Sequence, residues 1–89
     1  MAKKRRKLNK DFEKKIYSSK KNVELVLAKI YDIDDEDIQK EYMSAFNEVV
    51  SLYNGLRGDY DDQGFTDKSD ELLMSYEKAF NLFESEFEI

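Results

Sequence analysis

The sequence lacks several residue types that functional sites commonly use. Its 89 residues include no cysteine, histidine, proline or tryptophan, and only three glycines. Without cysteine the chain has no disulfide, no zinc–thiolate site and no thiol nucleophile. Without histidine it lacks the side chain that most often serves as a general base or metal ligand. Because no phosphate-binding glycine loop or nucleophile motif is present either, we expect that the protein is not an enzyme.

Long hydrophobic runs are also missing. The longest apolar run is Leu25 to Ala28, whereas a membrane-spanning helix needs about 20 such residues. The basic start, Lys3 to Lys7, leads into polar residues and not into the apolar stretch of a signal peptide. We therefore expect a cytoplasmic protein without a membrane span, and a chain this short should form one domain.

What the sequence does contain is apolar residues at helical spacing in three segments. The first segment has one stripe in steps of four and three, which consists of Phe12, Ile16, Ser19, Val23, Val26, Ile30 and Ile33. The second segment has two stripes, one of Ile38, Tyr42, Ala45, Val49, Leu52 and Leu56 and one of Met43, Phe46, Val50 and Tyr53. The third segment has Leu73, Tyr76, Phe80, Phe83 and Phe87. Such spacing is typical of amphipathic helices, and no segment alternates as a strand would.

The predicted fold class is all-α, a small antiparallel three-helix bundle with helices at about 9–32, 35–57 and 67–87. Residues 1–8 are expected to be a flexible basic tail, and residues 9–89 a single helical domain. The alternative is a helical hairpin whose third helix docks on another copy of the chain.

Polar residues and glycine indicate where the helices begin and end. The side chains expected to cap their N-termini are Asn9, Asp34, and Thr66 or Asp67. Ile33 and Ile38 would flank the Asp34 cap as a hydrophobic staple. The second helix is expected to end at Gly55 or, more strongly, at Gly58.

Charge is divided along the chain. Residues 1–22 carry ten basic and two acidic residues, whereas residues 23–89 carry five basic and eighteen acidic ones. In an antiparallel bundle one end collects the end of helix one, the start of helix two and the end of helix three. The acidic residues expected at this end, the acidic pole, are Asp32, Asp34, Asp35, Glu36, Asp37, Glu84, Glu86 and Glu88. The pole would fit a protein partner with a basic surface; alternatively, it only confers solubility.

These features favour a small acidic helical protein-interaction module. The composition, rich in lysine, aspartate, glutamate and asparagine, is compatible with a bacterial or phage protein of the inhibitor, antitoxin or immunity type. That assignment is an analogy between classes of protein. Self-association is also open at this point.

A second hypothesis concerns residues 59–70, which resemble an EF-hand calcium loop. Oxygen ligands are expected at the side chains of Asp59, Asp61, Gln63, Asp67 and Asp70. Gly64 stands where the loop needs its turn, and Phe65 where it uses a backbone carbonyl. Asp70 is shorter than the glutamate usual at the last position. The alternative is an acidic loop with capping aspartates and no cofactor.

A third hypothesis concerns the basic tail. Its five cationic residues are Lys3, Lys4, Arg5, Arg6 and Lys7, which would bind the phosphates of a nucleic acid. The tail contains no aromatic residue for base stacking. Nucleic-acid contact is expected nowhere else, because the second and third helices are strongly acidic and would repel it. The alternative is a flexible, solvated tail.

Overall fold

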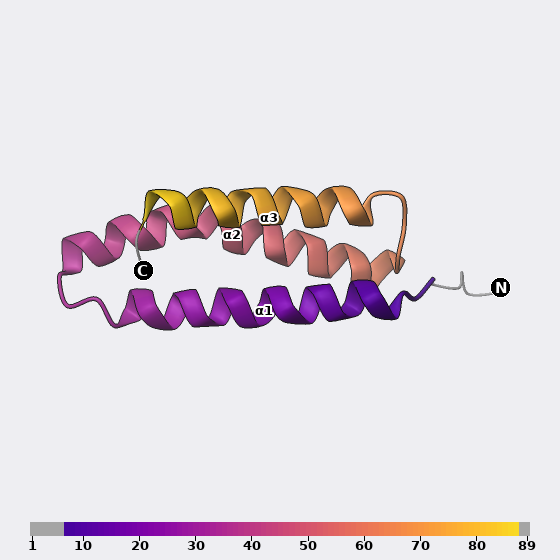
Figure 1. Ribbon diagram of the computed structural model, residues 1–89, viewed down its shortest axis with the longest axis horizontal. Helices are drawn as coiled ribbons and strands as arrows, with labels where there is room; N and C mark the ends of the chain where they lie inside the picture. The colour runs from indigo at the N-terminus through magenta and orange to yellow at the C-terminus, as the bar shows by residue number, and fades with distance from the viewer. Residues whose placement is uncertain (1–6, 88–89) are drawn as a thin grey trace.

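Three α-helices account for nearly all of the described chain (Figure 1). The structure is a computed structural model that describes residues 7–87. The helices are α1 (Lys10–Tyr31), α2 (Glu36–Gln63) and α3 (Ser69–Glu86), and each runs antiparallel to the one before it. Within these residues no strand is formed, so the prediction of an all-α three-helix bundle is confirmed. None of the three helices is long and apolar enough to cross a membrane.

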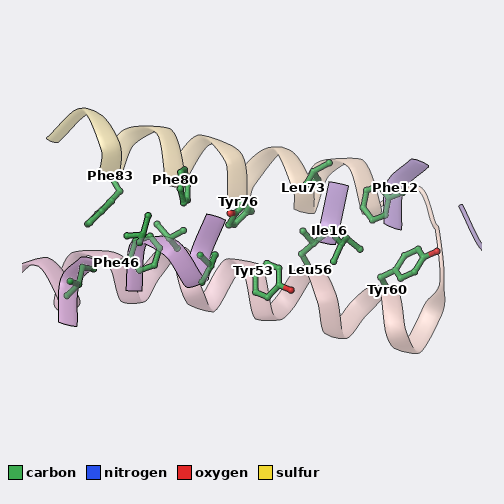
Figure 2. Packing of buried hydrophobic residues seen from close by; sticks show 14 residues of the cluster. Phe12, Ile16, Phe46, Tyr53, Leu56, Tyr60, Leu73, Tyr76, Phe80 and Phe83 are labelled. Atoms are coloured by element: carbon green, nitrogen blue, oxygen red, sulfur yellow. The ribbon is translucent and has the colours of Figure 1, made fainter. Parts of the chain in front are cut away.

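The core contains one row of buried side chains from each helix (Figure 2). The rows of α1 and α3 follow the predicted stripes, with Ile33 and Phe87 only half-buried at their ends. Ser19 is the polar member of the α1 row. Its hydroxyl donates a hydrogen bond to the carbonyl of Lys15 at 2.8 Å, and its own carbonyl accepts one from the Tyr76 hydroxyl at 3.3 Å. This polar position is thus satisfied within the core.

The buried row of α2 combines residues from both predicted stripes of this helix. It consists of Phe46, Val49, Tyr53, Leu56 and Tyr60, which follow steps of three and four. Ile38, the first member of the predicted stripe, is 44% exposed. The row thus takes residues from both stripes, and the other members of the stripes flank it on its two sides, as expected of a helix that packs against two neighbours.

Helix α2 does not end at Gly55 or Gly58, so this prediction was wrong. The helix continues to Gln63 because Leu56 and Tyr60, on either side of Gly58, are both buried in the core. A glycine inside a helix costs only about 1 kcal/mol, which such burial offsets. The true end is Gly64, whose φ of 74° is a conformation that glycine adopts without strain.

The caps differ in part from the prediction. Asn9 caps α1 as expected, since its side-chain oxygen accepts from the amide of Phe12 at 3.0 Å. Helix α2 is capped by Asp35 and not by Asp34, and Ile33 and Ile38 therefore do not occupy the staple positions. Neither Thr66 nor Asp67 caps α3, because the helix begins at Ser69, directly after Lys68, and no side chain of the described residues caps it. Ser69 instead fixes the connection, since its hydroxyl accepts from the amide of Thr66 at 2.8 Å.

The bundle is tied together at the end where α1 begins and the α2–α3 connection lies, here called the closed end (residues 7–13 and 60–69). The amide of Phe65 donates to the carbonyl of Lys7 at 2.6 Å, and the amide of Asn9 donates to the Tyr60 hydroxyl at 3.1 Å. The same hydroxyl donates to the carboxylate of Glu13. The ring of Phe12 contacts Tyr60 and Phe65, at 5.5 and 5.1 Å between centroids. The start of α1 therefore lies beside the second connection, as the antiparallel order of three helices requires.

Candidate functional site

Most of the predicted acidic pole lies where α1 ends and α2 begins, a region here called the tip (residues 31–38). Asp32 follows the last turn of α1, and its amide donates to the carbonyls of Ala28 and Lys29 at 3.2 Å. Asp35 caps α2, because its Oδ1 accepts from the amides of Asp37 and Ile38 at 2.9 and 3.2 Å. The acidic side chains of the tip, all exposed, are Asp32, Asp34, Asp35, Glu36 and Asp37. Acids at the start of α2 also interact favourably with its dipole.

Apolar side chains stand among these acids. Tyr31 is 69% exposed and Ile38 is 44% exposed, whereas Ile33 is half-buried. The connection is held by Gln39, whose side-chain amide donates to the carbonyls of Ile30 and Tyr31, each at 3.2 Å. The tip is therefore an ordered turn that presents apolar and acidic groups together.

Helix α3 ends before it reaches the tip (Figure 1). Phe87, the residue directly after α3, packs edge-on against Tyr42 of α2 with centroids 4.8 Å apart. Tyr42 lies seven residues beyond the cap Asp35, which is about 10 Å along a helix axis. Glu84 and Glu86 are therefore displaced along the bundle from the tip, and they line different hollows on two sides of α3, whereas Glu88 lies outside the described residues. The described acids of the predicted pole thus do not form one continuous surface.

The segment that resembles a calcium loop is not a loop throughout. The residues from Asp59 to Gln63 belong to the last turns of α2, and the connection between α2 and α3 covers only 64–68. The predicted helix bounds, which left residues 58–66 as the connection, were therefore wrong for residues 58–63, because the buried row of α2 extends to Tyr60. An EF-hand needs its first ligands on non-helical backbone.

Some of the proposed calcium ligands nevertheless lie together. Asp59, Gln63 and Asp67 line a hollow of about 500 Å³ with Thr66 and Lys68. One oxygen of Asp59, Oδ2, is buried and has no hydrogen-bond partner among the described residues.

The remaining two proposed ligands lie elsewhere. Asp61 projects to the α1 side of α2, where its carboxylate is 3.9 Å from the Arg57 guanidinium, and Asp70 is in the first turn of α3. Among residues 7–87 no group of three acidic side chains is arranged to hold a metal ion. Calcium binding stays a prediction.

The basic tail lies almost entirely outside the described residues. Lys7 is described: its side chain is exposed and its carbonyl accepts the hydrogen bond from Phe65. Lys3, Lys4, Arg5 and Arg6 lie outside the described residues, so the nucleic-acid hypothesis for the tail stays a prediction.

Two features were not identified from the sequence. The first is a hollow of about 520 Å³ between α1 and α3, lined in part by Lys14, Asn22, Tyr76 and Glu84. Burial against this seam raises the pKa of Tyr76 to about 12, because the ionised phenol would lose its hydration. The signal in the sequence is the charged residues next to the apolar stripes of α1 and α3, which a helical wheel of each segment would place beside this seam.

The second feature is the net positive charge of the whole of α1, since only the acidity of the other two helices was expected from the sequence. Helix α1 carries six lysines against three acidic residues, a net charge of +3. Helix α2 carries two basic and seven acidic residues, and α3 one basic and five acidic, which makes −5 and −4. The charge therefore changes sign across the bundle as well as along the chain.

These surfaces can bind partners of complementary charge and apolarity. Comparison of the chain with known protein families, with curated proteins and with solved structures found no match.

Proposed function

We propose that the chain is a protein-interaction module that binds a basic protein partner through the tip. The observation that carries the proposal is the coincidence of five exposed acids with the exposed Tyr31 and Ile38 on a turn that projects beyond α3. The sequence has no lysine or arginine between residues 30 and 39, so the tip itself offers these acids no opposite charge.

The chemistry of the tip suits recognition of a basic surface. Aromatic residues are enriched among the side chains that contribute most to binding, and complementary charge accelerates and orients association. Tyr31 and Ile38 would supply the apolar centre of the contact and the acids its rim. Since Gln39 already orders the turn, little conformational entropy would be lost on binding.

A module of this kind would act by occupying the basic surface of its partner. Small inhibitors, antitoxins and immunity-type proteins of bacteria or phage work in this way, and we place the chain in that functional class by analogy. A basic surface that normally contacts nucleic acid would be blocked by the acids of the tip.

The test is affinity capture from cells of the source organism, with the native chain and two charge-reversed variants. Glu36→Lys with Asp37→Lys changes the tip, and Asp35 is left intact because it caps α2. The matched control is Glu71→Lys with Glu77→Lys, which makes the same change of charge on exposed positions of α3.

We expect a basic protein that is retained by the native chain and the control but not by the tip variant. Circular dichroism should show that all three chains have the same helix content. A partner retained equally well by the tip variant, or the absence of any specific partner, would contradict the proposal.

A further inference from the structure

The side of α1 that faces away from the core forms a cationic, partly apolar ridge. Its members follow steps of four and three and are all exposed; they are Lys10, Lys14, Tyr17, Lys21, Leu25 and Ala28. Tyr17 and Leu25 are each 60% exposed, and the Lys21 ammonium lies 5.0 Å from the centre of the Tyr17 ring. The ridge is about 27 Å long, and Glu24 is an acidic residue at its edge.

A groove of about 370 Å³ runs along the seam between α2 and α3, on the other side of the molecule. The groove is lined by the small side chains of Ala45 and Ala79 and by Leu52 and Leu82, of which Leu82 is 58% exposed. Small residues on a helix seam let another helix approach closely, at the 8–10 Å axial distance typical of packed helices.

The charged residues that line this groove are two acids and one lysine, so the acids are in excess. Glu48 on α2 and Glu86 on α3 are acidic, and Lys78 is basic. Both helices also have a strong net negative charge, as described above. The groove therefore matches an amphipathic helix with lysines beside its apolar residues.

We infer that the occupant of the α2–α3 groove is the α1 ridge of a second copy of this chain. The ridge offers the two properties that the groove requires, exposed apolar side chains and lysines at helical spacing. Tyr17 and Leu25 would lie over the alanines and leucines of the groove, and Lys14 and Lys21 would face Glu48 and Glu86. A net charge of −5 disfavours random association of copies, so this alignment of opposite charges selects one arrangement.

The two surfaces belong to different sides of the chain, which determines how copies associate. A ridge that enters a groove makes a heterologous contact, because the surfaces that meet are different on the two copies. Each pair then keeps one groove and one ridge available for further copies. Association should therefore continue beyond dimers as concentration rises, and it should weaken with salt because the charged rim is exposed.

The experiment is sedimentation velocity of the full-length chain at low salt over a wide range of concentrations. We expect the average mass to rise above 10.6 kDa with concentration, and to fall again when salt is added. Two double variants separate the surfaces: Lys14→Glu with Lys21→Glu changes the ridge, and Glu48→Lys with Glu86→Lys changes the groove. Each alone should weaken self-association by more than about tenfold, because like charges would then face each other.

An equimolar mixture of the two double variants provides the decisive measurement. In the mixture the unchanged ridge meets an acidic groove, and the acidic ridge meets a basic groove, so association should return. The matched control is Glu77→Lys with Glu84→Lys on the α1 side of α3, which should associate as the native chain does. Helix content measured by circular dichroism should be the same for every variant.

A native chain that stays at 10.6 kDa at all concentrations would overturn the inference. So would a mixture that stays monomeric while the native chain associates, because the contact would then involve other surfaces. The outcome is independent of the function proposed for the tip, since Glu36→Lys with Asp37→Lys should leave self-association unchanged.

Discussion

Both ends of the bundle carry aromatic and apolar residues, but these side chains pack against one another at the closed end and are exposed at the tip. At the closed end, α1, α2 and the second connection meet around Phe12, Tyr60 and Phe65, and the Tyr60 hydroxyl bonds both to the Asn9 amide before α1 and to Glu13. At the tip only α1 and α2 are present, and Tyr31 and Ile38 are exposed to solvent. Aromatic and apolar residues at one end therefore stabilise the fold, whereas those at the other are available to a partner.

The length of the helices explains this difference. Helix α2 has 28 residues and α3 has 18, so α3 covers only part of α2. Because α3 starts at the closed end, the part of α2 that it leaves uncovered is at the tip. Changes at the closed end should therefore affect stability, and changes at the tip should affect binding.

The largest expected effect comes from truncating a side chain of the closed end. Phe12→Ala should lower the free energy of unfolding by about 3–5 kcal/mol, because it leaves a cavity between Tyr60 and Phe65. Tyr31→Ala at the tip should change it by less than about 0.5 kcal/mol. Urea unfolding followed by circular dichroism measures both values, and equal losses would remove the distinction between the two ends.

An effect of intermediate size on the free energy of unfolding is expected from a change of pH. It concerns Tyr76, a core residue that lies between the two ends of the bundle (Figure 2). Tyr76 is buried, and its pKa is raised to about 12, above the value of about 10 for an exposed tyrosine. The folded state therefore favours the neutral phenol, so this contribution is complete below pH 10 and is lost as the pH rises towards 12. The loss should be on the order of 2 kcal/mol.

This pH effect is measured by urea unfolding at pH values from 9 to 12. Tyr76→Phe should be less dependent on pH over that range, because it has no phenol to ionise. The matched substitution Tyr31→Phe at the exposed tip should leave the dependence as it is in the native chain. If Tyr76→Phe and the native chain had the same pH dependence, ionisation of Tyr76 would not be its cause.

The smallest expected effect compares two neighbouring aspartates of the tip. Asp35→Ala should lower the free energy of unfolding by about 1 kcal/mol, because Oδ1 of Asp35 accepts two amides at the start of α2. Asp34→Ala should change it much less. Thermal unfolding of both variants tests the assignment of the cap, and a larger loss for Asp34→Ala would restore the cap predicted from the sequence.

Much of the fold could be predicted because periodicity is a local property. The stripes of α1 and α3 indicated their buried faces, and Asn9 was recognised as a cap from its position before the first apolar residue. The end of α2 was predicted wrongly because Gly58 was weighed without Tyr60, whose burial depends on contacts with Phe12 from a distant part of the sequence. The choice between Asp34 and Asp35 failed for a different reason, since both are aspartates and residue type alone does not distinguish them as caps.

For the candidate site, the sequence predicted which acidic residues are present but not how they are arranged in space. The acids of the tip follow from the chain order of α1 and α2, but their separation from Glu84 and Glu86 depends on how far α3 extends. The ligands proposed for calcium are adjacent in sequence, yet the helix turns Asp59 and Asp61 to different sides of α2. Side chains two residues apart point in different directions on a helix, so a loop pattern fails once the segment is helical.

The amino-acid sequence by itself determined the number of helices, their order and the excess of acidic charge after residue 22, because these properties depend on residue types and spacing. Only the tertiary structure decided that α3 stops short of the tip, that α2 continues through two glycines, and that the lysines of α1 lie on the opposite side from the acidic α2–α3 groove. Those features depend on burial between residues far apart in the chain, which local spacing does not encode.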